Sequence, residues 1–450
     1  MKLTRLFSGL FLFTLFNLFI LNVALPSVAP TLFSRDLMLY VESWADAPGK
    51  HKGQGDSWTP MTAAYRHYQE SPEELIYSKI FFEEKTKFQY PPTSLFVMTP
   101  LQGLAEDQTF RLINGLNWIS WLFVLFNGPL AAAIYFYGWE RLYGDKLKGR
   151  LGWGSVLLVG ILGALYYPML RGYHIGQIQV WLNGMASLLI LFWLRNWQGP
   201  AGILVGLMCL IKPQYGVIYL WGVARRRWPF VIAATLTGGL GVLLSLTLFG
   251  WANHFDYFPA VSFMSRHGEV FYANQSVNGL LNRWFQTGPV MGFLMNEFAA
   301  YHPVVYWGTL STSLLLVVVA LYTPHQQKES WGDVYDLSAA LMIGTMASPI
   351  AWEHHYGILL PIYAVILPLV LKYPLWREAT LPALTLSFLL TSNYFILFNR
   401  FWAGRLNVLL SYLFFGALIL LGLLLAWRIY PRAQIERSEE SLPLGDLSKA

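Results

Sequence analysis

The sequence contains many runs of roughly 17 to 25 mostly apolar residues, such as residues 407–427. A helix of this length crosses the ~30 Å hydrocarbon core of a bilayer, whereas helices buried in soluble proteins are usually shorter. Because a backbone in lipid must satisfy its own hydrogen bonds, only helices or a closed β-barrel can span the bilayer. The runs do not alternate in polarity as barrel strands would, so they predict membrane-spanning helices.

Composition supports the same conclusion. Hydrophobic residues make up 55% of the 450 residues and charged residues 12%, whereas soluble domains contain about 25% charged residues. We therefore predict an all-α polytopic integral membrane protein that crosses the bilayer about eleven to thirteen times. The single Cys209 excludes an internal disulfide, and no zinc-type spacing of Cys and His is present. The expected spans lie near residues 1–31, 113–137, 152–169, 178–194, 199–211, 214–224, 229–250, 303–322, 336–350, 356–371, 378–395 and 407–427.

Two of these spans allow more than one interpretation. Residues 1–31 begin with Lys2 and Arg5 before an apolar stretch, which also describes a secretory signal peptide. That stretch is longer than a signal peptide needs, and no small-x-small cleavage site follows it, so we predict a retained first helix. Residues 199–224 are too short for two ordinary crossings and are split by Lys212-Pro213, so two short spans or one broken, re-entrant hairpin would fit.

Basic residues in the short loops predict the orientation, because Lys and Arg accumulate on the cytoplasmic side. We expect one transmembrane domain over residues 1–428, with its long loops 32–112 and 251–302 outside, and a polar cytoplasmic tail over residues 429–450. The net charge of +6 reflects this bias, and nothing in it indicates nucleic-acid binding. The residues placed inside are Arg141, Lys146, Lys148, Arg150, Arg195, Arg225, Arg226, Arg227, Lys372, Arg377, Arg428 and Arg432.

Ionisable and polar residues gather where the external loops meet the membrane. Asp36 directly follows the first helix, where a carboxylate is costly unless it has a partner or a function. Pairing with Arg35, or hydration by lipid headgroup water, is the simpler explanation for this acid. Between two later helices, Arg171 and Gln177 offer hydrogen-bond donors on either side of a glycine-containing turn.

Two further clusters lie at the outer ends of predicted helices. Lys212 precedes a helix-breaking proline within apolar sequence, so this segment is not a plain lipid-facing helix, although a snorkelling Lys would look the same. Glu353, His354 and His355 stand together between two hydrophobic spans. Adjacent histidines point in different directions on a helix, which argues against a metal site and leaves phosphate contact as the better use of the imidazoles. A polar loop contributes Asn274 and Gln275, which could bind hydroxyls or a phosphate.

Acids and bases thus collect on one face of the membrane, and an enzyme on the outer face has no ready access to nucleotide sugars. A sugar linked to a lipid phosphate solves this problem, because the lipid tail can lie between helices while Arg, Lys and His bind the phosphate. The ordered motifs over roughly residues 30–360 resemble glycosyltransferase family 87. They are Asp36 with Tyr40, Tyr90-Pro91-Pro92, Gly176-Gln177, Ile211-Lys212-Pro213, Asn274-Gln275-Ser276, Ser348-Pro349, Trp352 and His354-His355.

This resemblance implies a GT-C fold and a polyprenyl-phosphate-sugar donor, with mannose expected ahead of arabinofuranose. It implies that Asp36 is the catalytic base of an inverting transfer. It places Lys212, His354 and His355 near the donor phosphate, with Arg171 as a further phosphate ligand and with Gln177, Tyr90, Asn274 and Gln275 as substrate-binding residues. Because Asp36 has no immediate acidic neighbour, we expect no metal and no other cofactor.

The expected partners are the lipid-linked donor, a glycolipid or glycan acceptor and membrane lipids, in a multi-pass protein of the cell membrane whose active site faces the extracytoplasmic side. Two other functions stay open. A transporter or flippase of lipid-linked saccharides would place its charged groups near the bilayer midplane on broken helices, and not at one interface. An O-antigen ligase or polymerase would depend on arginines of a large late loop, where Arg266 and Arg283 lie.

Overall fold

The computed structural model describes residues 2–46, 48, 55–103, 108–143, 149–293, 296–322, 330–372 and 374–429. The helices in these ranges are α1 (Lys2–Leu15), α2 (Leu25–Val28), α3 (Asp36–Ala45), α4 (Trp58–Glu70), α5 (Thr109–Tyr143), α6 (Gly149–Ala164), α7 (Tyr167–Ile175), α8 (Gln179–Leu194), α9 (Gln198–Ile211), α10 (Gly216–Ala224), α11 (Trp228–His267), α12 (Val277–Phe285), α13 (Pro303–Tyr322), α14 (Ser330–Met346), α15 (Leu359–Lys372), α16 (Pro374–Thr391) and α17 (Tyr412–Ile429). Two π-helical segments, η1 (Phe16–Ala24) and η2 (Tyr77–Glu83), and the 3₁₀ segments η3 (Pro92–Leu101), η5 (Pro213–Tyr215), η6 (Glu353–Ile358), η7 (Ile396–Phe401) and η8 (Arg405–Ser411) connect them.

Helices dominate the described part of the chain, where the only extended pairing is an isolated bridge between Asn274 and Trp352. Within the residues that the structure describes, seven helical segments are long and apolar enough to cross a membrane, which confirms the predicted all-α, multi-pass class. The other predicted spans form shorter helices, among them the apolar helices Gln179–Leu194, Gln198–Ile211 and Thr380–Thr391. The seven long segments are Ser8–Val28, Thr109–Tyr143, Gly152–Ile175, Trp228–His267, Pro303–Tyr322, Glu353–Lys372 and Arg405–Trp427.

The first helical segment, which runs from α1 through η1 to α2, is joined to the bundle by buried amides. Asn393 donates to Asn17 Oδ1 at 2.8 Å and accepts from Asn22 Nδ2 at 3.2 Å, and all three side chains are buried. Hydrogen bonds of this kind between membrane helices favour association, because hydrocarbon offers the amides no other partner. The segment therefore packs against α16 and its neighbours as part of the bundle.

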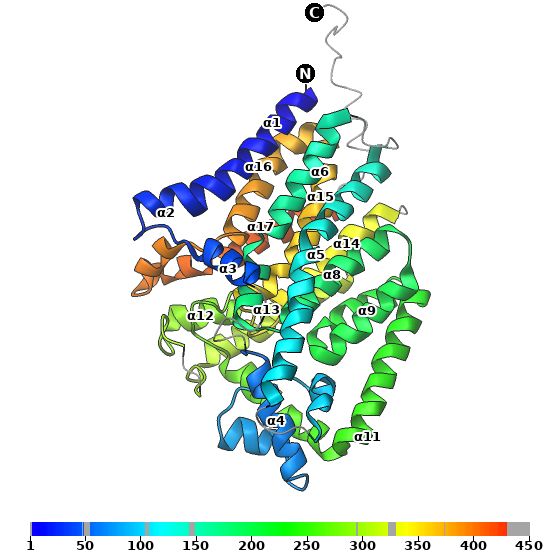
Figure 1. Ribbon diagram of the computed structural model, residues 1–450, viewed down its shortest axis with the longest axis vertical. Coiled ribbons are helices and arrows are strands. Elements are labelled where there is room, and N and C mark those ends of the chain that lie inside the picture. Colours follow the sequence, from blue (N-terminus) through cyan, green and yellow to red (C-terminus); the bar gives the residue numbers. More distant parts are fainter. Residues whose placement is uncertain are drawn as a thin grey trace, which may run out of the picture.

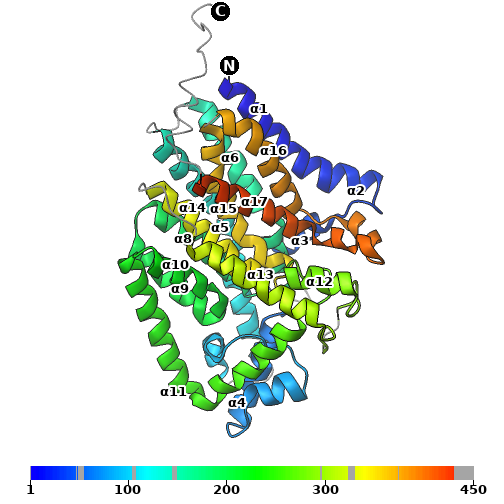
Figure 2. The same ribbon diagram turned by 180° about the vertical axis from the view of Figure 1, so that it is seen from behind.

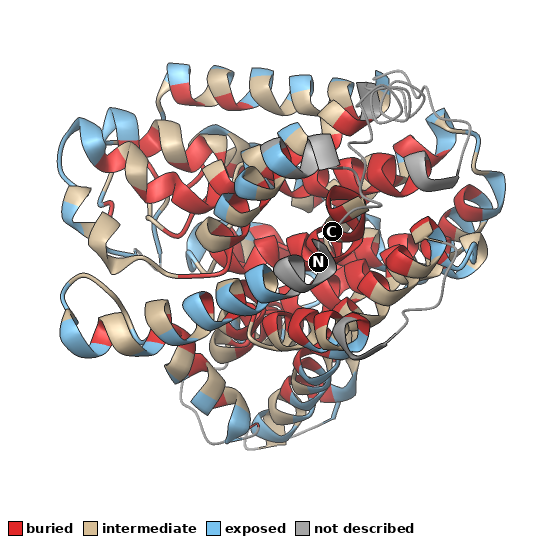
Figure 3. Cartoon of the chain, turned by 90° about the horizontal axis from the view of Figure 1, so that it is seen from above, coloured by how far each residue is buried: buried red, intermediate tan, exposed pale blue. Residues whose placement is uncertain are grey.

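Small residues let neighbouring helices approach closely. A Cβ atom on Gly202 of α9 would lie 2.2 Å from the Phe230 carbonyl oxygen of α11, and one on Gly128 of α5 would lie 2.6 Å from the Gly160 carbonyl oxygen of α6. Contacts of this kind replace the hydrophobic effect as the source of helix association in lipid. Figure 3 shows the outcome, with buried residues in the middle of the bundle and exposed residues on its outer helices.

The segment 199–224 folds as two short helices joined by a sharp turn. α9 has 14 residues and α10 has 9. At about 1.5 Å per residue neither is long enough to cross the ~30 Å hydrocarbon core alone. Pro213 begins the connecting 3₁₀ turn, which places Lys212 at the tip of a broken hairpin. Of the two interpretations that the sequence allows, this geometry fits the hairpin.

The opposite end of this hairpin carries buried ion pairs. Arg225 Nε lies 2.6 Å from Asp336 Oδ2, and Arg227 pairs with Asp333 in the same way. Asp336 is fully buried. Two arginines that the sequence places among simple cytoplasmic anchors therefore also hold α10 to the first turns of α14.

The polar loops lie at one end of the molecule. α1 begins at one end of the bundle, while α4 lies at the opposite end, as Figure 1 and the reverse view in Figure 2 both show. α11 changes direction at Gly250, whose φ of 73° only glycine adopts readily, so its last residues run beside the loop that contains α4. Asp256 in this part of α11 accepts hydrogen bonds from the backbone of Tyr77 and Ser78, which fixes the last part of α11 to the loop that contains α4.

The orientation can be tested by cysteine labelling, after replacement of the native Cys209 by Ala. Glu73→Cys in the loop 32–112 is expected to react with an impermeant maleimide in intact cells, because Glu73 is exposed. Ala224→Cys at the exposed end of α10 should react only after permeabilisation. Ser57 would be a poor probe, since its side chain is fully buried. The opposite labelling pattern would reverse the orientation.

Candidate active site

Asp36 stands at the first position of α3, where the helix dipole favours a carboxylate. Its backbone N–H donates to Ser34 Oγ at 2.9 Å. Burial raises the pKa of the Asp36 carboxyl, while the hydrogen bond with Ser34 and the charge of Arg171 act in the opposite direction. Arg35 instead donates to Ser27 Oγ at 3.0 Å. The charge that stabilises Asp36 is therefore that of Arg171, and the pairing with Arg35 considered from the sequence is not the one that forms.

Arg171 connects α3 to the segment that follows α14. Its Nη1 donates to the Tyr40 hydroxyl at 2.8 Å, one turn along α3 from Asp36, and its Nε lies 4.0 Å from Glu353 Oε2. The Tyr167 hydroxyl donates to the same Glu353 oxygen at 3.1 Å. The Glu353 side chain is 2% exposed and that of Arg171 is 20% exposed. Arg171 is therefore already engaged by protein groups on two sides.

Lys212 at the tip of the hairpin has two neutral partners. Its Nζ donates to Gln179 Oε1 at 2.8 Å and lies 2.6 Å from His355 Nε2. His355 Nδ1 lies 3.2 Å from the Trp352 carbonyl oxygen. Because a carbonyl can only accept, Nδ1 carries the imidazole proton, and Nε2 accepts from the Lys212 ammonium. His355 therefore positions Lys212, which differs from the direct phosphate contact that the resemblance implies for it.

The charge of Lys212 is not balanced by a contacting acid. Among the described residues, no carboxylate lies within ion-pair distance of its Nζ. An ammonium has three N–H donors, and the two neutral acceptors use two of them. One N–H donor is left for an anion, and the acid Asp56 acts on the ammonium only through its charge and without an ion-pair contact. Lys212 is thus the residue of this region best suited to bind a phosphate.

Gln177 and Tyr90 belong to a second network, which is centred on Ser57. Ser57 Oγ lies 2.8 Å from both the Tyr90 hydroxyl and Gln177 Oε1, and it accepts from the Ile178 backbone N–H at 3.0 Å. Gln177 Nε2 donates to Asp56, an exposed acid. The Tyr90 ring also faces Lys212, with its centroid 5.8 Å from Nζ. The network connects the loop 32–112 to the turn after α7.

Asp56 was missed by sequence reasoning, because nothing in the pattern around it distinguishes it from other loop acids. Its role becomes visible only through Gln177, which is 121 positions away in the sequence. The backbone N–H of Asp56 donates to the Ile175 carbonyl at 2.9 Å, which holds this part of the loop against α7. Asp56 is the second acid of the region that solvent reaches.

Asn274 and Gln275 lie inside the protein and use their amide groups on it. Asn274 Nδ2 donates to the Glu269 and Pro349 carbonyls at 2.9 and 3.1 Å, and its Oδ1 accepts from the Ala351 backbone. Gln275 Nε2 donates to two carbonyls, each at 2.8 Å, and both residues are fully buried. The two amides hold the loop that contains α12 to the segment before η6, and a substrate could reach them only by displacing these bonds.

A salt bridge that the sequence did not suggest joins the same segments. Lys87 Nζ lies 2.7 Å from Glu269 Oε1, and Trp352 Nε1 donates to Glu269 Oε2 at 2.7 Å. The side chains of Lys87 and Glu269 are 10% and 6% exposed. Each oxygen of Glu269 thus has one partner. The bridge connects the loop 32–112, the loop after α11 and Trp352, the residue before Glu353.

Two groups of side chains meet at η6, and together we name them the polar cluster: Asp36, Tyr40, Arg171 and Glu353 in the first group, and His355 and Lys212 in the second. The first group contains the carboxylate of Asp36, which can accept a proton, and the second contains the Lys212 ammonium, which can bind an anion. His354 lies between Glu353 and His355 in the sequence, and its buried Nε2 has no hydrogen-bond partner. Within the described ranges, no group of three or more His, Cys, Asp or Glu residues is arranged to hold a metal ion.

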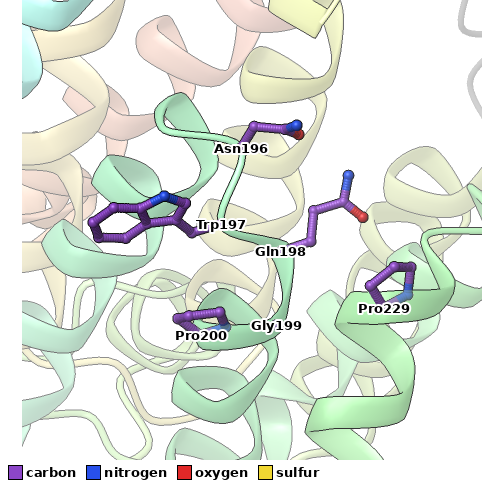
Figure 4. Close-up of a pocket in the computed structure, with 6 residues that line it drawn as sticks. All are labelled: Asn196, Trp197, Gln198, Gly199, Pro200 and Pro229. Atoms are coloured by element: carbon purple, nitrogen blue, oxygen red, sulfur yellow. The ribbon is translucent and has the colours of Figure 1, made fainter.

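The surface hollow in Figure 4 lies elsewhere, between the α8–α9 connection and the start of α11. Its lining contains no ionisable side chain, so it offers neither an acid nor a base. The residues around it are Asn196, Trp197, Gln198, Gly199, Pro200 and Pro229. We therefore place the chemistry at the polar cluster.

The sequence profile of glycosyltransferase family 87 matches residues 88–349, more than half of the chain. The chain belongs to this family. The matched residues include Arg171, Gln177 and Lys212, while Asp36 and the two histidines at 354 and 355 lie outside them.

Curated relatives come from mycobacteria. One from Mycobacterium tuberculosis is a polyprenol-phosphate-mannose-dependent alpha-(1-2)-phosphatidylinositol mannoside mannosyltransferase, 22% identical over 62% of this chain and 61% of its own. Another from the same species acts on phosphatidylinositol pentamannoside by its name and is 25% identical over 61% of this chain and 57% of its own. A relative from Mycolicibacterium smegmatis is 21% identical over 62% of this chain and 61% of its own length. The chain spans about three-fifths of the length of these relatives.

Proposed function

We propose that this family 87 protein transfers mannose from a polyprenyl-phosphate donor to a hydroxyl of a glycolipid or glycan acceptor, with inversion at the anomeric carbon. The observation that carries the proposal is the Lys212 ammonium, whose two hydrogen-bond partners are neutral, in one cluster with the half-buried acid Asp36. The donor is the one in the names of the mycobacterial relatives. An anion site and a base are the two groups that such a transfer requires.

In the proposed reaction the acceptor oxygen forms a bond to the anomeric carbon while the bond from that carbon to the phosphate oxygen breaks. Asp36 takes the hydroxyl proton, and the electron pair of the breaking bond leaves with the polyprenyl phosphate. Lys212 stabilises the charge that grows on this phosphate, and His355 keeps Lys212 in place. Arg171 keeps Asp36 ionised and holds α3 against η6. No metal is required in this scheme.

Gln177 and Tyr90 form the border of the proposed donor site. Their network with Ser57 places the Tyr90 ring over Lys212, and the phosphate would bind beside this ring. His354 offers a partner-free Nε2 near the same place and would bind a donor oxygen. Asn274 and Gln275 support the site from behind by fixing the loop to the segment before η6.

We propose that the active site faces the extracytoplasmic side of the cell membrane, in a single transmembrane domain over residues 1–428. The Lys and Arg asymmetry of the short loops supports this orientation. The loops 32–112 and 251–302 would then lie outside the cell and would bind the acceptor. The proposed cytoplasmic tail over residues 429–450 lies outside the described residues except for Ile429.

A donor assay tests the proposal. Purified protein in lipid is offered radiolabelled polyprenyl-phosphate mannose, polyprenyl-phosphate arabinofuranose and nucleotide sugars, with phosphatidylinositol mannoside as the first acceptor because the relatives' names include it. We expect transfer from the mannose donor, and none from the nucleotide sugars.

The same preparation also tests whether the protein is a transporter of the lipid-linked sugar and not a transferase. A flippase would move the labelled lipid across the bilayer of a proteoliposome without releasing polyprenyl phosphate. Movement without release, or transfer from a nucleotide sugar, would contradict the proposal. The polar cluster lies beside the external loops at the ends of helices, which favours the enzyme, because transporters place such groups at the midplane.

A further inference from the structure

Glu353 is a buried acid, and one of its two carboxylate oxygens has no hydrogen-bond partner. Its Oε2 accepts from the Tyr167 hydroxyl at 3.1 Å and faces Arg171 Nε at 4.0 Å, whereas its Oε1 is buried without a hydrogen-bond partner. A carboxylate has about four lone-pair sites, and burying one oxygen without a donor costs free energy. An ion pair with Arg171 alone would not explain this arrangement, because that pair uses the other oxygen.

Glu353 lies in η6 between residues that contact the two groups of the polar cluster. On one side, Arg171 faces Glu353 and donates to Tyr40, which lies on the same helix as Asp36. On the other side, His355, two residues after Glu353 in η6, contacts Lys212. Glu353 therefore lies between the proposed base and the proposed phosphate site. The sugar ring that connects the anomeric carbon to the phosphate has to occupy this interval.

Tyrosine rings surround the same position. Tyr167 lies against Tyr394 with a centroid distance of 6.3 Å and an interplanar angle of 12°, and Tyr394 lies 6.0 Å from Tyr272. Tyr272 and Tyr394 are half-buried. Aromatic faces next to a carboxylate suit the apolar faces and hydroxyl groups of a sugar. Tyr394 and Glu353 both lie outside the part of the chain that the family profile matches.

We propose that Glu353 is a specificity-determining residue, whose Oε1 accepts a hydrogen bond from one hydroxyl of the donor sugar beside Tyr272 and Tyr394. This inference rests on the proposed function. A site built to hydrogen-bond a hydroxyl rejects an analogue that lacks it, because the buried acceptor is then left without a partner. Glu353 would thus select among sugars that share the same lipid phosphate.

Deoxy donors test the assignment. Polyprenyl-phosphate mannose and its 2-, 3-, 4- and 6-deoxy forms are compared by kcat/KM in the wild type and in Glu353→Gln. For one deoxy donor the wild type should lose roughly ten- to a hundred-fold. Glu353→Gln should lose a similar factor with the intact donor, and removal of that same hydroxyl should then cause little further loss.

Glu269→Gln is the matched control. Glu269 is also a buried acid of this region, but each of its oxygens already has a protein partner. Glu269→Gln should leave the ratio of kcat/KM between the intact donor and each deoxy donor the same as in the wild type. Thermal unfolding of both variants shows whether either change acts through the fold.

Two outcomes would overturn the inference. Independent, multiplicative losses for Glu353→Gln with every deoxy donor would reduce Glu353 to a charge partner of Arg171. The inference would also be wrong if the wild type used all four deoxy donors nearly as well as polyprenyl-phosphate mannose. This result does not depend on whether Glu353→Gln folds. Failure of the wild type to use the intact donor would instead contradict the proposed function itself.

Discussion

Asp36→Asn is expected to lower turnover by ~10²–10⁴, the usual contribution of a positioned general base. A sugar hydroxyl ionises far above neutral pH, so its attack is slow unless a carboxylate takes the proton as the bond forms. Asn keeps the size of Asp36 and most of its hydrogen bonding but cannot accept this proton. The KM for the donor should change little, because Asp36 and Lys212 belong to different groups of the polar cluster. Single-turnover and steady-state kinetics in lipid measure both quantities.

The pH profile provides a second measure of the same residue. Burial raises the pKa of Asp36, so its carboxyl takes up a proton at a higher pH than an ordinary aspartate. Activity requires the ionised form and should therefore fall on acidification while exposed carboxyls are still ionised. Arg171→Gln removes a charge that opposes this shift and should move the acid limb to higher pH.

Two other acids serve as controls for Asp36. Glu42 is exposed on the same helix, and Glu42→Gln should keep wild-type turnover. Asp56 is the exposed acid that pairs with Gln177 and is the alternative base. If Asp56→Asn abolished turnover while Asp36→Asn did not, the base would be Asp56, and the direction of attack would have to be reassigned.

Lys212→Met is expected to lower kcat/KM for the donor by roughly ten- to a hundred-fold, because a charge-assisted hydrogen bond to the phosphate contributes about 1.5–3 kcal/mol. The loss should be specific to the lipid phosphate and smaller for the acceptor. His355→Ala should cause a weaker effect in the same direction, since His355 acts by holding the ammonium in place. Donor titrations at saturating acceptor measure these effects.

Lys85 offers a matched control, because it is an exposed cation of the loop 32–112. Lys85→Met should leave donor kinetics unchanged, which separates a local phosphate contact from the general positive charge of the surface. A folded Lys212→Met variant with wild-type donor kinetics would remove Lys212 from the phosphate site. The ammonium would then serve only to join Gln179 to His355.

Hydropathy was sufficient to predict the all-α membrane class. Residue type selected Asp36 and Lys212 as candidates because each is an ionisable residue next to a helix end, where hydrocarbon makes a charge without a function costly. The break at Lys212-Pro213 was visible for a similar reason, since proline cannot continue the ladder of helix hydrogen bonds.

The pairing of side chains could not be predicted in the same way. Glu353 stands in the sequence beside two histidines, but its partners Tyr167 and Arg171 lie more than 180 positions earlier. Asn274 has the same residue type as a sugar-binding amide, and only its burial shows that it joins two loops. A single sequence carries the chemistry of each residue but not the distances between residues that are far apart in the chain.

The ion pair between Arg225 and Asp336 also constrains how the protein is made. Its two members are 111 positions apart, so the ribosome delivers Arg225 to the membrane well before α14 exists. Until then the guanidinium must stay at the headgroups, because a buried charge without its partner costs several kcal/mol. The final seating of the hairpin that carries Lys212 therefore waits for α14, and nascent chains released before this helix should be substrates for membrane quality control.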